Sequence, residues 1–149
     1  GMFSSRGYNI DSLSVAPTHD PAVSRLTLVT SGSDSVIHQI IQQTRKLVDV
    51  VEITDLSSRD HLEYELLLLK VGVTPASARP VVDCVRQHHG LILDETDDTR
   101  TVQITGTAPE LDAFLRELGG IAPVLELVRS GVAALERGHA ILGVPAAAT

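Results

Sequence analysis

The order of strands and helices predicted between residues 62 and 129 constrains the fold of this chain more than any other feature. Residues 62–71 open this stretch, and their apolar run 66–69 predicts a strand buried on both faces, although periodicity alone would also allow a helix. The elements that follow are a helix, two strands, a second helix and a last strand, at residues 77–89, 91–96, 100–105, 107–119 and 124–129. This β-α-β-β-α-β order is typical of a ferredoxin-like α+β unit.

The two helices of this stretch carry clear signals at their ends. Thr107 followed three residues later by Glu110 predicts a capping box. Pro80 lies in the first turn of the helix over 77–89, where its missing N–H costs little, and Gly90 is expected to cap the end of that helix. The side chains expected to face the core are Val81, Val82, Val85, Leu111, Phe114, Leu115 and Leu118.

The first part of the chain repeats the same order with its beginning absent. Arg6 and Gly7 predict the end of a helix, because glycine adopts the left-handed conformation that a helix end needs. The elements expected next are a strand, a turn, a strand, a helix and a strand, at residues 10–15, 18–21, 23–30, 34–46 and 48–56. We therefore expect two tandem ferredoxin-like units, the first lacking its opening strand.

Composition excludes several classes of protein. Hydrophobic residues make up 43% of the chain but aromatic residues only 3%, so the core must be built from aliphatic side chains. The net charge of -7 argues against nucleic acid or an anionic membrane surface as a partner. No apolar run reaches the roughly 18 residues of a membrane-spanning helix. Cys84 is the single cysteine, which rules out an internal disulfide and fits a cytoplasmic setting.

No catalytic motif or metal-binding pattern is found in the sequence. The glycine-rich phosphate and dinucleotide motifs and the nucleophile elbow are absent. His88 and His89 are adjacent, but neighbouring positions on a helix point about 100° apart and make a poor metal pair. Cys84 is interpreted as a small buried apolar side chain rather than a nucleophile. We therefore predict no catalytic residue and no metal site.

Asn9 is the polar residue with the clearest potential for binding. It follows the predicted helix end and begins a strand, so its amide could bind the α-amino or carboxylate group of a small ligand. The alternative is that Asn9 bonds nearby backbone in a turn, and the residues alone favour that alternative. Arg25 and Arg129 lie in predicted strands and are either solvated or ion-paired, or contact a partner protein.

A long motif in the same region resembles a known family. Residues 6–27 read R-G-Y-N-I-x-S-L-x-V-A-P-T-x-D-P-x-x-S-R-x-T, which is similar to the signature of the regulatory (small) subunit of acetolactate synthase, also called acetohydroxyacid synthase. Further matches follow in the same order as in the family, at residues 46–50, 101–103, 106–107, 111–115 and 129–132. The resemblance extends from the start of the chain to about residue 138. Residues 1–7 resemble the interior of the family's first helix, so the resemblance implies that the chain is a fragment without the start of that helix and the strand before it. The alternative is that Gly1 is left over from a tag.

The resemblance implies a domain organisation and an effector site. Residues 1–57 would form an incomplete ACT domain, 61–138 a C-terminal ferredoxin-like regulatory domain and 139–149 a tail. In this family the ACT domain pairs sheet edges across a homodimer and holds an amino acid between the subunits. Its effector site uses the positions matched by Asn9 and Ile10, and the rest of that site lies on a turn after the absent strand, so we expect low affinity for the effector.

The function implied by the resemblance is regulation without catalysis. The chain would bind the catalytic (large) subunit of acetolactate synthase, raise its activity and confer feedback inhibition by a branched-chain amino acid, with valine expected. Thiamine diphosphate, FAD and Mg would belong to that catalytic subunit, in the bacterial cytoplasm. The alternative is a stand-alone ACT-type amino-acid sensor and dimerisation module. RNA binding on a ferredoxin-like sheet needs exposed aromatic and basic residues, and this chain has few aromatic residues and an acidic balance.

Overall fold

The computed structural model describes residues 9–47 and 49–143 of the chain, so the helix end predicted at Arg6 and Gly7 lies outside the described residues. The chain divides into two compact units. The second unit runs Glu63–Ala133, and the first contains the residues before and after it. No helix in the described part of the chain is long and apolar enough to span a membrane.

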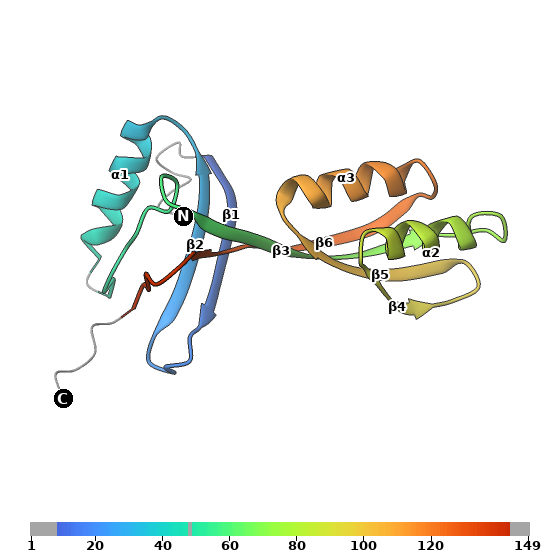
Figure 1. The fold of residues 1–149 in the computed structure, drawn as a ribbon, viewed down its shortest axis with the longest axis horizontal. Helices are drawn as coiled ribbons and strands as arrows, with labels where there is room; N and C mark the ends of the chain where they lie inside the picture. The colour runs from blue at the N-terminus through green and yellow to red at the C-terminus, as the bar shows by residue number, and fades with distance from the viewer. Residues whose placement is uncertain (1–8, 48, 144–149) are drawn as a thin grey trace. The chain divides into compact units, whose positions relative to one another are not determined.

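The second unit has the strand order of a ferredoxin-like fold. Its elements are β3 (His61–Gly72), α2 (Ala78–Gln87), β4 (Leu91–Glu95), β5 (Thr99–Gly106), α3 (Ala108–Gly119) and β6 (Val124–Glu136), the ends of β3 and β6 being grouped with the first unit. The four strands lie in the order β4-β5-β3-β6, and both helices cover one face of the sheet (Figure 1). The first and third strands of the unit are therefore central, as the β-α-β-β-α-β order predicts.

The core of this unit lies between the sheet and its two helices. On β3, alternate side chains point inward: Leu67 pairs with Ile104 of β5, and Leu69 with Val102, all four being buried. The helices contribute Val81, Cys84, Val85, Leu111, Phe114 and Leu118 to the same cluster. The burial of Val82 and of the run 66–69 differs from the prediction. Val82 is only half-buried, with Cys84 in the core position, and the run 66–69 is fully buried on one face only.

The helix ends follow local chemistry, with one correction. Thr107 and Glu110 form the predicted capping box, reciprocally satisfying backbone N–H groups. At the end of α2, however, His89 and not Gly90 adopts the left-handed conformation, with φ of 60°. The His89 N–H donates to Arg86 O at 3.0 Å and the Gly90 N–H to Val85 O at 2.8 Å, which is the Schellman pattern. Gly90 is needed for space, because an added Cβ would lie 2.9 Å from Val85 Cγ1.

The last strand is longer than predicted. This strand was predicted to end at residue 129, but β6 continues to Glu136. Ser130 Oγ accepts a hydrogen bond from the Leu66 N–H at 3.0 Å, and Gly131 has a φ of 86° that favours glycine. The Ser-Gly pair therefore marks an irregularity inside a strand, a recognised position for glycine, and not its end.

The first unit consists of a two-stranded sheet and a helix beside it (Figure 1). Strands β1 (Asn9–Pro17) and β2 (Ser24–Ser31) pair antiparallel, and α1 spans Asp34–Arg45. The strand predicted over 48–56 is wrong: Val48 lies outside the described residues, and 49–56 form no strand. Its β-branched pattern suits a strand only where a neighbouring strand accepts its backbone hydrogen bonds, and the described residues offer none here.

The apolar residues of the first unit are largely exposed. Among the described residues, Ile40 of α1 is its only buried hydrophobic side chain. On the sheet, Leu13, Val15 and Leu26 expose 49%, 59% and 53% of their surface. These three side chains form an apolar face of the β1–β2 sheet that the described part of the chain leaves uncovered.

The predicted fold class, α+β with ferredoxin-like organisation, is confirmed.

Candidate functional site

Asn9 and Ile10 lie at one end of the β1–β2 sheet, where the sequence analysis placed a candidate effector site. The Asn9 Nδ2 donates to Ser31 Oγ at 2.8 Å, and the Asn9 carbonyl oxygen accepts from Thr30 Oγ1 at 2.5 Å. Ile10 pairs with Thr30 and is half-buried. Asn9 thus bonds across the strand pair rather than within a turn, and Ser31 fixes the direction of its side chain.

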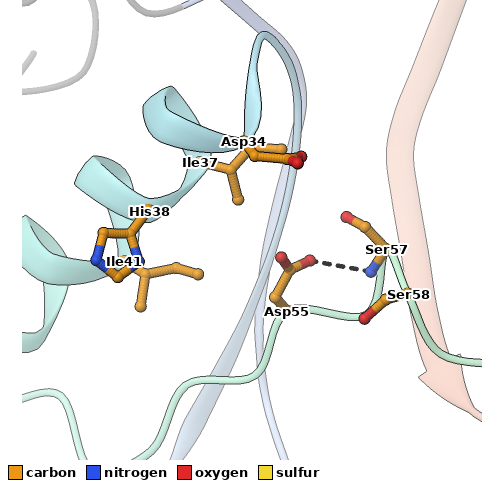
Figure 2. A pocket seen from close by; sticks show the side chains of 7 residues that line it. All are labelled: Asp34, Ile37, His38, Ile41, Asp55, Ser57 and Ser58. Carbon is orange, nitrogen blue, oxygen red and sulfur yellow. Dashed lines mark hydrogen bonds between the residues drawn. The ribbon is translucent and has the colours of Figure 1, made fainter.

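A separate open hollow of about 440 Å³ lies in the first unit, between α1 and the segment that follows it (Figure 2). It is lined by Asp34, Ile37, His38, Ile41, Asp55, Ser57 and Ser58, and the sequence analysis did not predict it. Asp55 Oδ1 accepts from the Ser57 N–H at 2.9 Å, and hydrogen bonding from the Ser57 side chain and then its backbone lowers the pKa of Asp55.

The chemistry of this hollow does not suit an amino-acid effector. Its lining includes two carboxylates but neither Lys nor Arg to bind the α-carboxylate of an amino acid. Asn9 and Ile10 are not among its lining residues. The hollow is therefore no substitute for the site predicted at the start of β1.

A cluster of three side chains with metal-ligating atoms lies on the helices of the second unit. Cys84 and His88 come from α2 and the segment just after it, and Glu117 from α3, with their ligand atoms all within 4.8 Å of one another. Burial, and then the charge of Glu117, raises the pKa of the Cys84 thiol. Glu117 was not predicted as a partner of His88, because it is 29 residues away and approaches only because α2 and α3 pack on one face of the sheet.

The two strand arginines both make intramolecular bonds. Arg129 pairs with Glu65 and lies 3.5 Å from Asp112 Oδ1. The hydrogen bonds that Arg129 donates to the Glu65 carboxylate raise the pKa of Arg129. Arg25 Nη2 donates to the carbonyl oxygen of Ala134 at 2.8 Å. The interpretation of Arg129 as ion-paired is therefore confirmed, whereas Arg25 bonds a backbone carbonyl.

Comparison with known families identifies the class of protein to which both units belong. The profile of a family described as an AHAS small subunit-like ACT domain matches residues 1–52, and that of a family described as the small subunit of acetolactate synthase matches residues 64–138. The two matches follow one another along the chain and define an ACT-containing small-subunit protein.

Similar proteins support the same assignment at the level of the whole chain. The acetolactate synthase isozyme 3 small subunit of Salmonella typhimurium is 44% identical over 142 residues, which is 95% of this chain and 87% of that protein. The acetolactate synthase isozyme 3 small subunit of Escherichia coli is 43% identical over 142 residues, again 95% of this chain and 87% of that protein. The chain belongs to the acetolactate synthase small-subunit family.

A solved structure supports the fold as well. The crystal structure of the acetolactate synthase small subunit from Thermotoga maritima matches this structure with a TM-score of 0.83 and 32% sequence identity. The match covers 93% of this chain and 86% of that one.

Proposed function

We propose that this chain is a regulatory subunit that binds the catalytic subunit of acetolactate synthase, raises its activity and makes it sensitive to a branched-chain amino acid, with valine the expected effector. The observation that carries the proposal is that both units of the chain match acetolactate synthase small-subunit families, in order. In this account the chain makes and breaks no bonds itself. Thiamine diphosphate, FAD and Mg act on the catalytic subunit.

The effector site is proposed at Asn9 and Ile10, where β1 begins. The Asn9 side chain is oriented by Ser31, so an amide donor and acceptor sits beside the half-buried Ile10. That combination suits a small amino acid, whose polar end needs hydrogen bonds and whose aliphatic side chain needs apolar contact. Neighbouring Thr30 holds the backbone at Asn9.

A homodimer formed through the first unit would complete this site. In the described residues, each strand of the two-stranded sheet has one unpaired edge, and open edges pair readily with another chain. The exposed side chains of Leu13, Val15 and Leu26 add apolar area that a second copy can bury. An amino acid held between two copies would report its presence through the arrangement of the dimer.

The effector acts by preferring one arrangement over another. Only a difference in affinity between two arrangements moves their equilibrium. A coupling free energy of about 1–3 kcal/mol changes the activity or affinity of the partner roughly 5- to 150-fold. The proposal therefore needs only a few hydrogen bonds that differ between the two arrangements of the dimer.

Acetolactate production by the catalytic subunit, measured with and without this chain, tests the proposal. We expect the chain to raise the rate, and valine, leucine or isoleucine to lower it again, valine most strongly. A stand-alone amino-acid sensor would bind an amino acid without co-purifying with the catalytic subunit or changing its rate. That result would favour the alternative function.

A further inference from the structure

We propose that Cys84, His88 and Glu117 form a binding site for a single Zn²⁺ ion in the second unit. The inference is independent of the effector site and of the catalytic partner. It rests on how two helices bring a thiol, an imidazole and a carboxylate together.

Helix geometry accounts for the first two ligands. Cys84 and His88 are four residues apart at the end of α2, so their side chains project from the same side of the helix. The Schellman pattern that ends α2 fixes the backbone here, with His88 N–H donating to Cys84 O at 3.3 Å. The third ligand, Glu117, comes from the last turns of α3.

The distances between the ligand atoms bracket those of a tetrahedral metal site. His88 Nε2 lies 2.6 Å from Glu117 Oε2, and the ligand atoms of all three residues lie within 4.8 Å of one another. In a tetrahedral zinc site with bonds of about 2.0–2.3 Å, ligand atoms are about 3.3–3.8 Å apart. Binding an ion would therefore lengthen the 2.6 Å separation between His88 and Glu117, through side-chain rotation. The His88 ring is already held by an edge contact with buried Phe114, at 5.2 Å between centroids.

The three residues differ in exposure, from the buried Cys84 to the most exposed, Glu117. Cys84 is 2% exposed, whereas the side chains of His88 and Glu117 are 25% and 46% exposed. An ion can therefore approach from the Glu117 side and reach the thiol last. On binding, the Cys84 thiol releases its proton to water and binds as thiolate, one neutral ring nitrogen of His88 donates its lone pair, and a water fills the fourth position.

Softness of the ligands selects the metal class. Thiolate and imidazole favour zinc over magnesium or calcium, which prefer oxygen ligands. The other reading of the cluster is an ion pair of His88 with Glu117 beside a core cysteine. The two readings differ in whether the thiol takes part.

The test uses the untagged full chain, freed of metal with a chelator and titrated with Zn²⁺ by calorimetry and against a chromophoric chelator. We expect one high-affinity ion per chain, with affinity falling more than about tenfold in Cys84→Ala, His88→Phe and Glu117→Gln. His89→Gln is the matched control, because this exposed histidine lies next to His88 outside the cluster, and it should bind zinc as the parent chain does. Glu117→Gln changes an exposed side chain, so its result does not depend on an intact core.

A second readout follows the thiol directly. Cys84 is the only cysteine in the chain, so loss of its alkylation on adding Zn²⁺, and a thiolate-to-metal absorption band on adding Co²⁺, report this site alone. Both signals should disappear in Glu117→Gln at ion concentrations that saturate the parent chain. Zinc binding that is unchanged in Glu117→Gln and Cys84→Ala, or that is lost in His89→Gln, would overturn the proposal.

Discussion

Arg129 holds the carboxylate of Glu65 with two guanidinium nitrogens, Nε at 3.0 Å from Oε1 and Nη2 at 3.2 Å from Oε2. Glu65 is a buried charged residue of β3, 8% exposed, and Arg129 is on β6, the neighbouring strand. Such two-pronged pairs are geometrically specific. The pair fixes how β6 lies against β3, because a buried carboxylate needs its partner.

Removing one member of this pair is predicted to lower the stability of the second unit. Arg129→Met leaves Glu65 without its cation and should lower the free energy of unfolding by about 2–3 kcal/mol, less than for a fully buried pair because Arg129 is one-third exposed. The double variant Glu65→Leu with Arg129→Met should recover most of the loss. Urea unfolding measures both. The control Asp83→Asn breaks the exposed Arg79–Asp83 pair and should cost less than about 0.5 kcal/mol. If Arg129→Met and Asp83→Asn lower the free energy of unfolding equally, this account of the Glu65–Arg129 pair is contradicted.

At the end of α2, one substitution is predicted to raise the free energy of unfolding. His89→Gly should stabilise the chain by about 1 kcal/mol, because glycine adopts the φ of 60° there without the cost that a Cβ imposes. Gly90→Ala should destabilise it, since the new Cβ would meet Val85 Cγ1 at 2.9 Å and Gln103 O at 3.1 Å. Thermal unfolding of the two variants tests both predictions. Stabilisation by Gly90→Ala would show that the helix end is described wrongly.

The exposed apolar face of the first unit is predicted to drive self-association. Val15→Asp places a charge opposite Leu26 on that face and should weaken the dimer at least about tenfold, as measured by sedimentation equilibrium. Ile141→Asp is the control, because Ile141 is 91% exposed and lies outside the strands. A dimer equally strong in the Val15 variant would place the contact between copies elsewhere.

The proposed effector site predicts separable effects on activation and inhibition. Asn9→Ala should raise the valine concentration for half-inhibition by about tenfold or more, since a hydrogen bond to a charged group contributes about 1.5–3 kcal/mol. Activation of the catalytic subunit should be retained. Ser31→Ala removes the bond that orients Asn9 and should give a smaller shift of the same sign. If valine inhibits the Asn9 variant as it does the parent, the effector does not bind at Asn9.

Local signals in the sequence predicted the second unit well. The Thr107–Glu110 capping box needs only two side chains three residues apart, and it is present as expected. The inward positions of α3 also follow from helical spacing, with Leu111, Phe114 and Leu118 buried. Where the decisive contacts are local, sequence alone is sufficient.

Features that depend on partners distant in sequence were predicted less well. The β-branched run after α1 reads as a strand, but strand propensity is realised only beside another strand. The last strand was predicted to end at residue 129, yet β6 continues through Gly131 to Glu136. The approach of Glu117 to His88 depends on how α2 and α3 pack over one sheet face, which no local pattern encodes.

The central claim is that this chain regulates an acetolactate-forming enzyme and catalyses nothing itself. The most direct test is the acetolactate rate of the purified catalytic subunit, with its cofactors, as this chain is added and valine is then titrated. The account predicts no acetolactate from this chain alone, a saturable rise in rate with the chain, and a fall with valine that Asn9→Ala weakens. A rate that stays unchanged at saturating concentrations of the chain, with or without valine, would contradict it.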